Sequence, residues 1–152
     1  MTHDVRIVPV SELEGAPNLA EFLAEYAKEA KTDGMPPPKV HVDAYHVMEK
    51  SGAMTTIGAF DGATVIGLII MLVTIVPHYS VPVAHLESFF VAESHRNTGA
   101  GFRLLKMAEV TAKEKGAAGI VVSAYIGSTL DMVMSGKRNY QKKYVGYFRG
   151  LL

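Results

Sequence analysis

Apolar and polar residues follow two kinds of pattern along the 152-residue chain, and these patterns predict helices and strands in a mixed order. Helices are expected where apolar side chains recur three and four positions apart, because such residues share one helix face. Strands are expected in apolar runs that are rich in β-branched residues or that alternate with polar ones. The predicted helices are residues 16–31, 40–50, 101–116 and 128–139, and the predicted strands are 5–10, two runs within 54–80, 83–93, 118–126 and 140–152.

The dipeptide Asp61-Gly62 separates the two β-rich runs of residues 54–80. It favours a two-residue type I′ turn, so we expect a β-hairpin here. Residues 118–126 lack alternation, which is typical of a strand covered on both faces. No repeat with a period of roughly 20–50 residues and no low-complexity linker divides the chain. The expected architecture is one α/β domain over residues 1–152 with a mixed sheet.

The composition describes a globular chain and excludes several kinds of chemistry. Hydrophobic residues make up 49% and charged residues 20%, which is ordinary for globular domains. The absence of cysteine excludes disulfides, thiolate zinc sites and an acyl-cysteine intermediate. The N-terminus lacks the apolar core of a signal peptide, and the most apolar run, residues 65–76, is shorter than the roughly 20 residues of a membrane helix. We expect a cytoplasmic protein without a membrane partner.

Charge is balanced overall but divided unevenly along the chain. Lysine plus arginine and aspartate plus glutamate each number 15, so no global field attracts nucleic acid or membrane. Residues 1–70 carry 5 basic and 10 acidic side chains, whereas residues 71–152 carry 10 and 5. The basic half either receives an anionic ligand or forms a solvated face. An RNA-binding domain is not favoured, because no RNA-binding motif accompanies the basic C-terminus. The six histidines show no spacing typical of a metal site, so no metal is expected.

A turn of small residues joins the predicted strand 83–93 to the predicted helix 101–116. Its sequence, Arg-Asn-Thr-Gly-Ala-Gly at 96–101, brings unpaired backbone N–H groups to the positive end of a helix dipole. Small residues allow a diphosphate to approach these groups, and the arginine adds charge. The spacing alone is a weak signal, and a glycine-eased turn that binds nothing is the alternative. The position between a strand and a helix favours a phosphate site.

The strand "LESFFVAE", the turn "RNTGAG" and the helix "FRLLKMAEVTAKEKGA" resemble the acetyl-CoA-binding core of the GNAT family of N-acetyltransferases. The flanking elements follow the family's order, so the resemblance covers nearly the whole chain. Residues 127–151 are similar to the C-terminal part of small bacterial or phage-encoded members. The resemblance implies a mixed, mostly antiparallel central sheet flanked by helices, with strands 83–93 and 118–126 splayed apart. It also implies that C-terminal strands can meet across a homodimer.

The resemblance implies acetyl-CoA as the cofactor, held by three parts of the chain. Backbone amides of residues 97–101 would cradle its diphosphate with Arg96 nearby, and the backbone of residues 89–91 would pair with its pantetheine arm. Ser128 lies where an asparagine of other members often meets that arm. The implied cofactor-binding residues are Phe89, Phe90, Val91, Arg96, Asn97, Thr98, Gly99, Ala100, Gly101 and Ser128.

Acetyl transfer to an amine needs a base, because a lysine-like ammonium has a pKa of about 10.4 and must lose a proton before it attacks. Glu87 stands four residues before Val91, as a catalytic glutamate does in several GNAT members, and is the implied base. His85 is a further candidate that assists or binds the acceptor. Alternation places His85, Glu87, Phe89 and Val91 on one face unless a bulge intervenes. A strand glutamate paired with a basic residue is the ordinary alternative.

The resemblance does not define the general acid. Many members have a tyrosine five residues before the aromatic residue of a Gly-Phe or Gly-Tyr pair. Here Ser135 occupies that position, and Asn139 replaces the glycine before Tyr140. Tyr140, Tyr125 and water are the candidates to protonate the departing thiolate.

The sequence therefore predicts an N-acetyltransferase that transfers an acetyl group from acetyl-CoA to a primary amine by direct attack in a ternary complex. The acceptor is an amine on a small molecule or on a protein. The alternative is a catalytically silent structural or interaction protein with the GNAT fold, which still binds coenzyme A or binds nothing. The departures at Ser135 and Asn139 favour that alternative, whereas the intact turn and Glu87 favour the enzyme.

Overall fold

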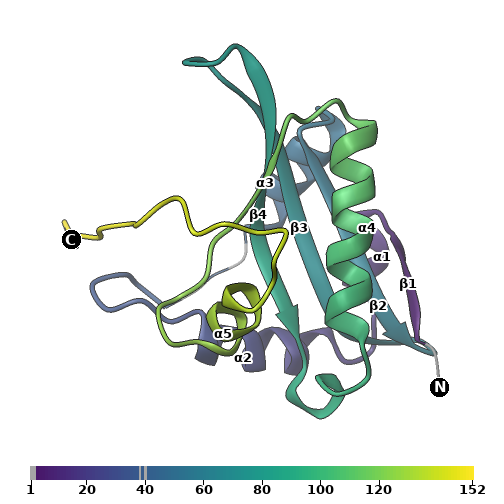
Figure 1. The fold of residues 1–152 in the computed structure, drawn as a ribbon. Coiled ribbons are helices and arrows are strands. Elements are labelled where there is room, and N and C mark those ends of the chain that lie inside the picture. The colour runs from purple at the N-terminus through teal and green to yellow at the C-terminus, as the bar shows by residue number, and fades with distance from the viewer. Residues whose placement is uncertain (1–2, 38, 40) are drawn as a thin grey trace.

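The computed structural model of the protein describes residues 3–37, 39 and 41–152. Five strands form one sheet in the order β1-β2-β3-β4-β5, with β4 and β5 parallel and all other neighbours antiparallel (Figure 1). The predicted mixed, mostly antiparallel sheet flanked by helices is confirmed. The strands are β1 (Asp4–Ile7), β2 (Met54–Asp61), β3 (Thr64–Val76), β4 (Val81–Val91) and β5 (Ile120–Val122). The helices are α1 (Val10–Glu14), α2 (Leu19–Glu29), α3 (Val42–Lys50), α4 (Ala100–Glu114), α5 (Thr129–Ser135) and the 3-10 helix η1 (Glu93–His95).

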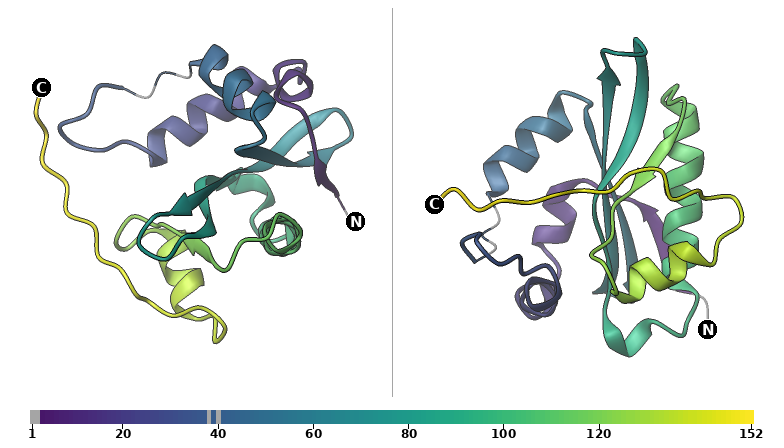
Figure 2. Two further views of the ribbon diagram at one scale, coloured as in Figure 1. Left: turned by 90° about the horizontal axis from the view of Figure 1, so that it is seen from above. Right: turned by 60° about the vertical axis from the view of Figure 1, so that its left-hand side comes forward.

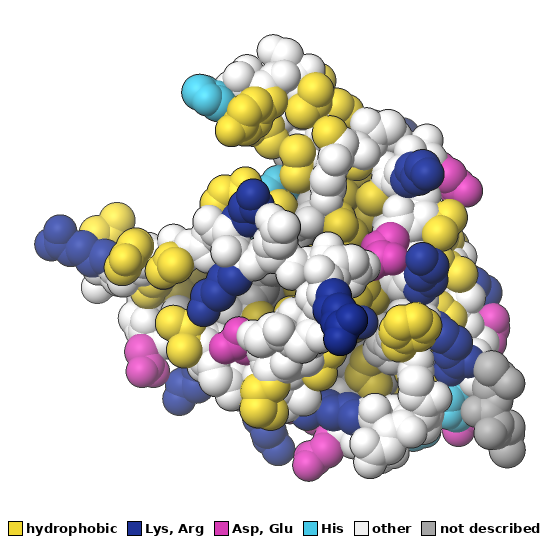
Figure 3. Space-filling model, in the orientation of Figure 1, with side chains coloured by type: hydrophobic (Ala, Val, Ile, Leu, Met, Phe, Trp, Pro, Cys, Tyr) yellow, Lys and Arg dark blue, Asp and Glu magenta, His cyan; other side chains and the backbone are white. Residues whose placement is uncertain are grey.

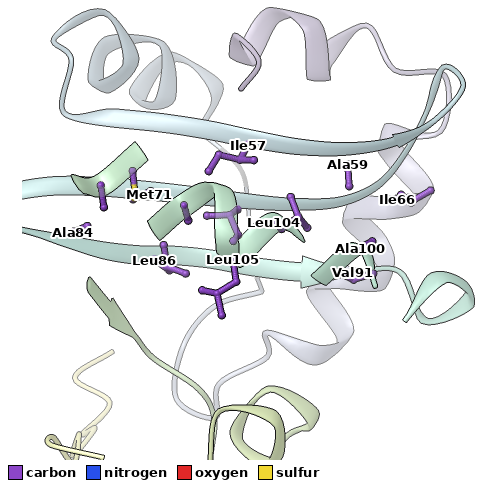
Figure 4. Packing of buried hydrophobic residues seen from close by; sticks show 13 residues of the cluster. Ile57, Ala59, Ile66, Met71, Ala84, Leu86, Val91, Ala100, Leu104 and Leu105 are labelled. Atoms are coloured by element: carbon purple, nitrogen blue, oxygen red, sulfur yellow. The ribbon is translucent and has the colours of Figure 1, made fainter. Parts of the chain in front are cut away.

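Helices cover the sheet on both faces (Figure 2). On one face lies α4, whose Leu104 joins Ile57 and Met71 in a fully buried apolar cluster (Figure 4). The opposite face carries α1 and α2, and there the rings of Phe22 and Phe90 pack edge to face with centroids 5.3 Å apart. These two apolar layers hold α2 and α4 on either side of β4.

The four helices predicted from spacing are present at the expected places, as α2, α3, α4 and α5. Val40, the first residue of the predicted helix 40–50, lies outside the described residues. The last helix is shorter than the predicted 128–139, because Gly136 follows its final residue. Its start agrees with the predicted cap, since the Ser128 side chain accepts a hydrogen bond from the Asp131 N–H at 3.1 Å.

Residues 5–10 do not form one strand, and this prediction is wrong. Strand β1 ends at Ile7, and Pro9, which has no N–H to extend a strand ladder, precedes the short helix α1. Val10 and Leu13 lie three positions apart on α1 and are both buried, and Leu13 belongs to the apolar cluster on this face of the sheet. Two buried positions were too short a pattern to distinguish a helical turn from a strand end.

The predicted hairpin is confirmed, but its turn differs from the expected one. Asp61 pairs with Thr64, so the two loop residues are Gly62 and Ala63. Gly62 has a φ of 60°, and it is the loop's one positive-φ residue. A glycine at the first loop position with one positive φ corresponds to a type II′ turn, not to type I′ over Asp61-Gly62.

A β-bulge in β4 interrupts the alternation at Glu87. Ser88 pairs with Ile70 and Leu86 with Met71, so Glu87 has no partner on β3. Leu86 before the bulge and Val91 after it both belong to the apolar cluster on the α4 side of the sheet. In a regular strand, two residues an odd number of positions apart lie on opposite faces. The extra residue at the bulge therefore changes which positions face α4. Glu87 therefore does not share a face with Phe89 and Val91, as uninterrupted alternation predicted.

The expected splay of β4 and β5 is present. The two strands pair only from Ala84 to Leu86 with Ile120 to Val122, whereas β4 continues to Val91. β5 is consequently much shorter than the predicted strand 118–126. Beyond the paired residues the strands diverge and leave one side of β4 without a strand neighbour.

The C-terminal residues 141–152, called here the C-terminal arm, form no strand, and the predicted strand 140–152 is wrong. The arm runs from α5 past the edge of the sheet, where it is drawn in yellow (Figure 1), and Gly150 lies against Gly34. Within the described residues no hydrogen bond joins the arm to the rest of the chain. A strand needs a ladder partner, and this part of the chain has none. Separately, none of the described helices has the length and apolarity required to cross a membrane.

Candidate active site

A cavity of about 570 Å³ opens where β4 and β5 part. Its walls come from β4 beyond the paired residues, from the C-terminal half of α2, from the start of α4 and from α5. The segment after β5 closes another side with Ser123, Ala124 and Tyr125. The splay of the sheet thus creates a space that is reached by the predicted turn and by the predicted catalytic strand.

The turn at the start of α4 presents free backbone donors. Gly99 is the N-cap residue with a φ of 80°, and no side chain caps the helix. Among the described residues, no hydrogen-bond acceptor is recorded for the backbone N–H groups of Asn97, Gly99, Gly101 and Phe102. Gly99 and Gly101 line the cavity, and a Cβ at Gly101 would meet Val91 at 3.6 Å. Free amides at a helix N-terminus form a site for an anion.

Arg96 ties this turn to α2 and to the end of β4. Its Nε donates to the carbonyl oxygen of Val91 at 2.9 Å, and its Nη2 donates to Oε1 of Glu29 at 2.7 Å. Its guanidinium carbon also lies 5.4 Å from the centre of the Phe90 ring. A second carboxylate of α2, Glu25, accepts from the Glu93 N–H at 2.8 Å. Glu25 and Glu29 are four residues apart on α2, and their common role was not visible from the sequence.

Lys137 lines the cavity, and in the sequence it is one of the ten basic residues of the C-terminal half. It follows α5, and its Nζ lies 5.1 Å from the centre of the Phe102 ring at the start of α4. This position brings a positive charge next to the free amides of the turn. Charge pattern alone did not distinguish Lys137 from the exposed Arg138 beside it.

Glu87 lies at the cavity in a small group of polar side chains. Its Oε2 accepts a hydrogen bond from Ser88 Oγ at 2.6 Å, and Ser88 Oγ accepts one from the Tyr26 hydroxyl at 3.1 Å. Burial, followed by the nearby Glu87 charge, raises the pKa of the Tyr45 hydroxyl on α3 above its usual value. Glu87 is therefore close to α2 and α3, on the side of the sheet opposite α4.

The candidates for the general acid lie in different places. Tyr125 lines the cavity, and its hydroxyl is bonded to Thr32 Oγ1 at 2.9 Å and to the Ala30 carbonyl at 3.2 Å. The Tyr140 hydroxyl instead donates to Oε1 of Glu109 on α4 at 2.9 Å, and Tyr140 does not line the cavity. Ser135 donates its hydroxyl to the Asp131 carbonyl within α5.

The structure brings most of the predicted site together. Glu87 lines the cavity, whereas His85 is half-buried on β4 and Tyr140 is turned toward α4. Asn97, Thr98 and Ala100 lie in the turn without lining the cavity; the Thr98 hydroxyl donates to the His95 carbonyl at 2.6 Å. The predicted cofactor-binding residues that line the cavity are Phe89, Phe90, Val91, Arg96, Gly99, Gly101 and Ser128.

The sequence model of the Acetyltransferase (GNAT) family matches residues 17–129, which include α2, the bulged strand, the turn and the start of α5. The chain belongs to the GNAT acetyltransferase family. GNAT acetyltransferases use acetyl-CoA, and the match places the turn and the splayed strands within the family domain. No curated protein matches the sequence significantly.

Solved structures of other GNAT acetyltransferases have the same fold. A ribosomal-protein-alanine N-acetyltransferase from Brucella melitensis biovar Abortus 2308 is 17% identical, with a TM-score of 0.73 over 98% of this chain and 99% of that one. AAC(6')-Iy, in complex with the bisubstrate analogue CoA-S-monomethyl-acetylneamine, is 17% identical, with a TM-score of 0.74 over 100% of both chains. An aminoglycoside acetyltransferase from an uncultured soil metagenomic sample is 14% identical, with a TM-score of 0.75 over 100% of both chains.

Proposed function

We propose that the protein is an N-acetyltransferase that transfers the acetyl group of acetyl-CoA to a primary amine by direct attack in a ternary complex. Support comes from its GNAT family membership and from one geometric observation. The same cavity is lined by Gly99 and Gly101 at the open start of α4 and by Glu87 on β4. An anion-binding end and a carboxylate thus share a space of about 570 Å³, which is an ordinary size for a ligand site. Residues 1–152 act together as one catalytic domain in this proposal.

The residues of the cavity fit coenzyme A through the chemistry of their donors. The free amides of Asn97, Gly99 and Gly101 and the Lys137 ammonium suit a diphosphate. The backbone of residues 89–91 has no strand neighbour on the β5 side, so it offers hydrogen bonds to an extended arm as a strand edge does. Phe102 and Leu105 supply apolar walls. When bound, acetyl-CoA supplies an activated thioester.

Glu87 is the proposed base. Oε2 of its carboxylate accepts from Ser88, whereas no hydrogen bond of Oε1 is recorded among the described residues. Oε1 is thus placed to take the proton that the acceptor ammonium loses. The neutral amine then forms a C–N bond to the thioester carbonyl carbon, the C–S bond breaks, and the nitrogen loses a second proton as the amide forms. One of the two protons ends on the sulfur of coenzyme A, and the other passes to solvent. His85, two residues before Glu87, is proposed to contact the acceptor.

The acceptor is proposed to be a primary amine on a small molecule or on a protein. The structural relatives include a ribosomal-protein-alanine N-acetyltransferase and an aminoglycoside acetyltransferase, one of each kind. Identities of 14–17% carry over the fold and leave the choice between these two classes open to experiment. Binding of nucleic acid or of a membrane is not part of the proposal.

A silent GNAT-fold protein is the second candidate, and it has one specific observation in its favour. The family's tyrosine position is occupied by Ser135, whose hydroxyl is bonded to its own helix, while Tyr140 is bonded to Glu109. Neither group reaches the cavity as a proton donor. The two candidates differ in turnover, since both allow binding of coenzyme A.

A thiol-release assay with acetyl-CoA and a panel of amines tests the proposed function. We expect wild-type turnover on at least one amine and a loss of about 10²- to 10⁴-fold in Glu87→Gln, the usual contribution of a general base. Glu114→Gln, an exposed change at the end of α4, is the matched control and should keep wild-type activity. Tight binding of acetyl-CoA without turnover on any amine would show the silent protein instead.

We also infer a homodimer formed through the C-terminal arm. Among the described residues, β5 is the last strand of the sheet and pairs with no strand on its outer edge. The arm exposes more than half the surface of six apolar side chains, among a projecting group of hydrophobic and basic residues (Figure 3). The six side chains are those of Tyr144, Val145, Tyr147, Phe148, Leu151 and Leu152. In a symmetric dimer, the arm of each copy pairs with the free β5 edge of the other copy.

A further inference from the structure

A buried serine connects two cavity-lining groups that belong to different elements. Tyr26 on α2 and Glu87 in the β4 bulge both line the cavity, while Ser88 is 5% exposed and lies behind the wall between them. The Tyr26 hydroxyl donates to Ser88 Oγ at 3.1 Å, and Ser88 Oγ donates to Glu87 Oε2 at 2.6 Å. The bulge makes this contact possible, because without it Glu87 and Ser88 point to opposite faces of the sheet.

The direction of the two hydrogen bonds depends on the protonation of Glu87. A carboxylate is an acceptor only, so both hydroxyl hydrogens point toward it, as in the structure. Rotation of the protonated carboxyl group turns the oxygen that took the proton toward Ser88. Glu87 is then a donor to Ser88, and Ser88 becomes a donor to Tyr26. The hydrogen of Tyr26 is then no longer engaged by Ser88 and is free to point into the cavity.

We infer that Tyr26 is the acid that protonates the departing thiolate, and that Ser88 relays to it the proton that Glu87 removes from the amine. This inference rests on the proposed acetyl transfer. An ammonium acceptor first loses one proton to solvent through Glu87. The second proton, lost by the nitrogen as the amide forms, moves to Glu87, one proton moves from Glu87 to Ser88, one from Ser88 to Tyr26, and one from Tyr26 to sulfur. The C–N bond has formed and the C–S bond has broken, and all three side chains are back in their starting protonation states. Tyr26 is a catalytic residue in this scheme, and Ser88 is a positioning residue.

Tyr26 fits this role better than the tyrosines considered from the sequence. Tyr140 donates to Glu109 and does not line the cavity. Tyr125 lines the cavity, but it bonds to Thr32 and Ala30 and has no recorded link to Glu87. Burial and the Glu87 charge raise the pKa of Tyr26, which keeps its proton in place until a base forms beside it.

Steady-state kinetics of wild type, Tyr26→Phe, Ser88→Ala and the double variant test the relay. The phenylalanine keeps the ring that packs on Phe90, so the change removes only the hydroxyl. We expect kcat to fall about 100-fold in Tyr26→Phe, with KM for acetyl-CoA within about twofold of wild type. Ser88→Ala should lose about tenfold. Tyr79→Phe, an exposed hydroxyl change at the tip of the β3–β4 hairpin, is the control.

The double variant distinguishes a relay from two independent structural effects. If Ser88 acts through Tyr26, Ser88→Ala does not lower kcat further in an enzyme that already lacks the Tyr26 hydroxyl. The double variant is then as active as Tyr26→Phe. Losses that multiply overturn the relay, and so does a Tyr26→Phe enzyme within about twofold of wild-type kcat. A larger loss in Tyr125→Phe than in Tyr26→Phe assigns the acid to Tyr125 and overturns the proposal. If wild type turns over no amine at all, the proposed function fails and the relay fails with it.

Discussion

Glu29 and Arg96 form an ion pair at the cavity, with Oε1 of the carboxylate 2.7 Å from Nη2 of the guanidinium. The pair joins α2 to the turn that precedes α4, across 67 residues of sequence. It also places a negative charge beside the amides that are proposed to hold a diphosphate. Arg96 therefore connects α2 to the turn, and the Glu29 carboxylate partly neutralises the charge that Arg96 can offer to a ligand.

Glu29→Gln should tighten coenzyme A binding by about two- to fivefold, because an exposed charge interaction of this kind is worth about 0.2–1 kcal/mol. Isothermal titration calorimetry at low salt measures the change, and added salt should reduce it. Glu21→Gln, at the exposed start of the same helix, removes an equal charge away from the cavity and serves as control. Weaker binding in Glu29→Gln would mean that the ion pair shapes the site more than its charge opposes the ligand.

Gly101→Val should abolish the stabilisation of the protein by acetyl-CoA. The added side chain would fill space beside Val91 in the cavity that is proposed to hold the cofactor. For wild type at a ligand concentration of 100 times Kd, about 2.7 kcal/mol of binding energy raises Tm by roughly 5–10 °C. Gly119→Val is the matched control, since that glycine has open space around it and lies outside the cavity. An unchanged Tm shift in Gly101→Val would place the diphosphate elsewhere.

Tyr140 should make the fold sensitive to alkali. Burial and the Glu109 carboxylate raise its pKa well above the usual 10.0, so the folded state holds the phenol proton more tightly than the unfolded state does. The resulting stability is fully present below pH 10 and is lost as the pH rises beyond it. Urea unfolding at pH 9, 10 and 11 should show a shallower loss in Tyr140→Phe than in wild type. Tyr147→Phe changes a fully exposed tyrosine and should follow wild type.

Deletion of residues 141–152 should convert the protein from a dimer to a monomer. Light scattering after size exclusion is expected to give twice the 16.4 kDa of one chain for wild type and the mass of one chain for the truncated form. The arm makes no recorded hydrogen bond to its own body within the described residues, so the truncated chain should remain folded. A wild-type monomer at every concentration tested would contradict the inferred homodimer.

Local patterns predicted the elements whose signals lie within a few residues. The helical spacing of α2 and α4 and the Asp61-Gly62 dipeptide are such signals. The choice between turn types was not local, because the pairing of Asp61 with Thr64 depends on how β2 and β3 align along their length. The strand expected after residue 140 illustrates the same limit, since β-rich residues form a strand only where a partner edge is present.

The site was predictable to the extent that it rests on the turn and on the resemblance around Glu87. The link between Arg96 and Glu29 was not, because the two residues are far apart in sequence and each looks like an ordinary surface charge. Tyr26 was hidden for a related reason. Tyr26 occupies an apolar position of the α2 pattern, so packing of its ring is enough to explain its place in the sequence. A role for its hydroxyl becomes visible only from its hydrogen bond to Ser88 in the structure.

The unpaired residue in β4 has a consequence for anyone who engineers this strand. Deleting that one residue would leave a regular ladder, with Ser88 directly after Leu86 just as Ile70 directly precedes Met71. Every other side chain of β4 would keep its present face, and only the carboxylate would be lost. The irregularity thus adds a cavity-lining group to a strand whose packing does not depend on it, so the deletion separates loss of the carboxylate from inversion of the strand.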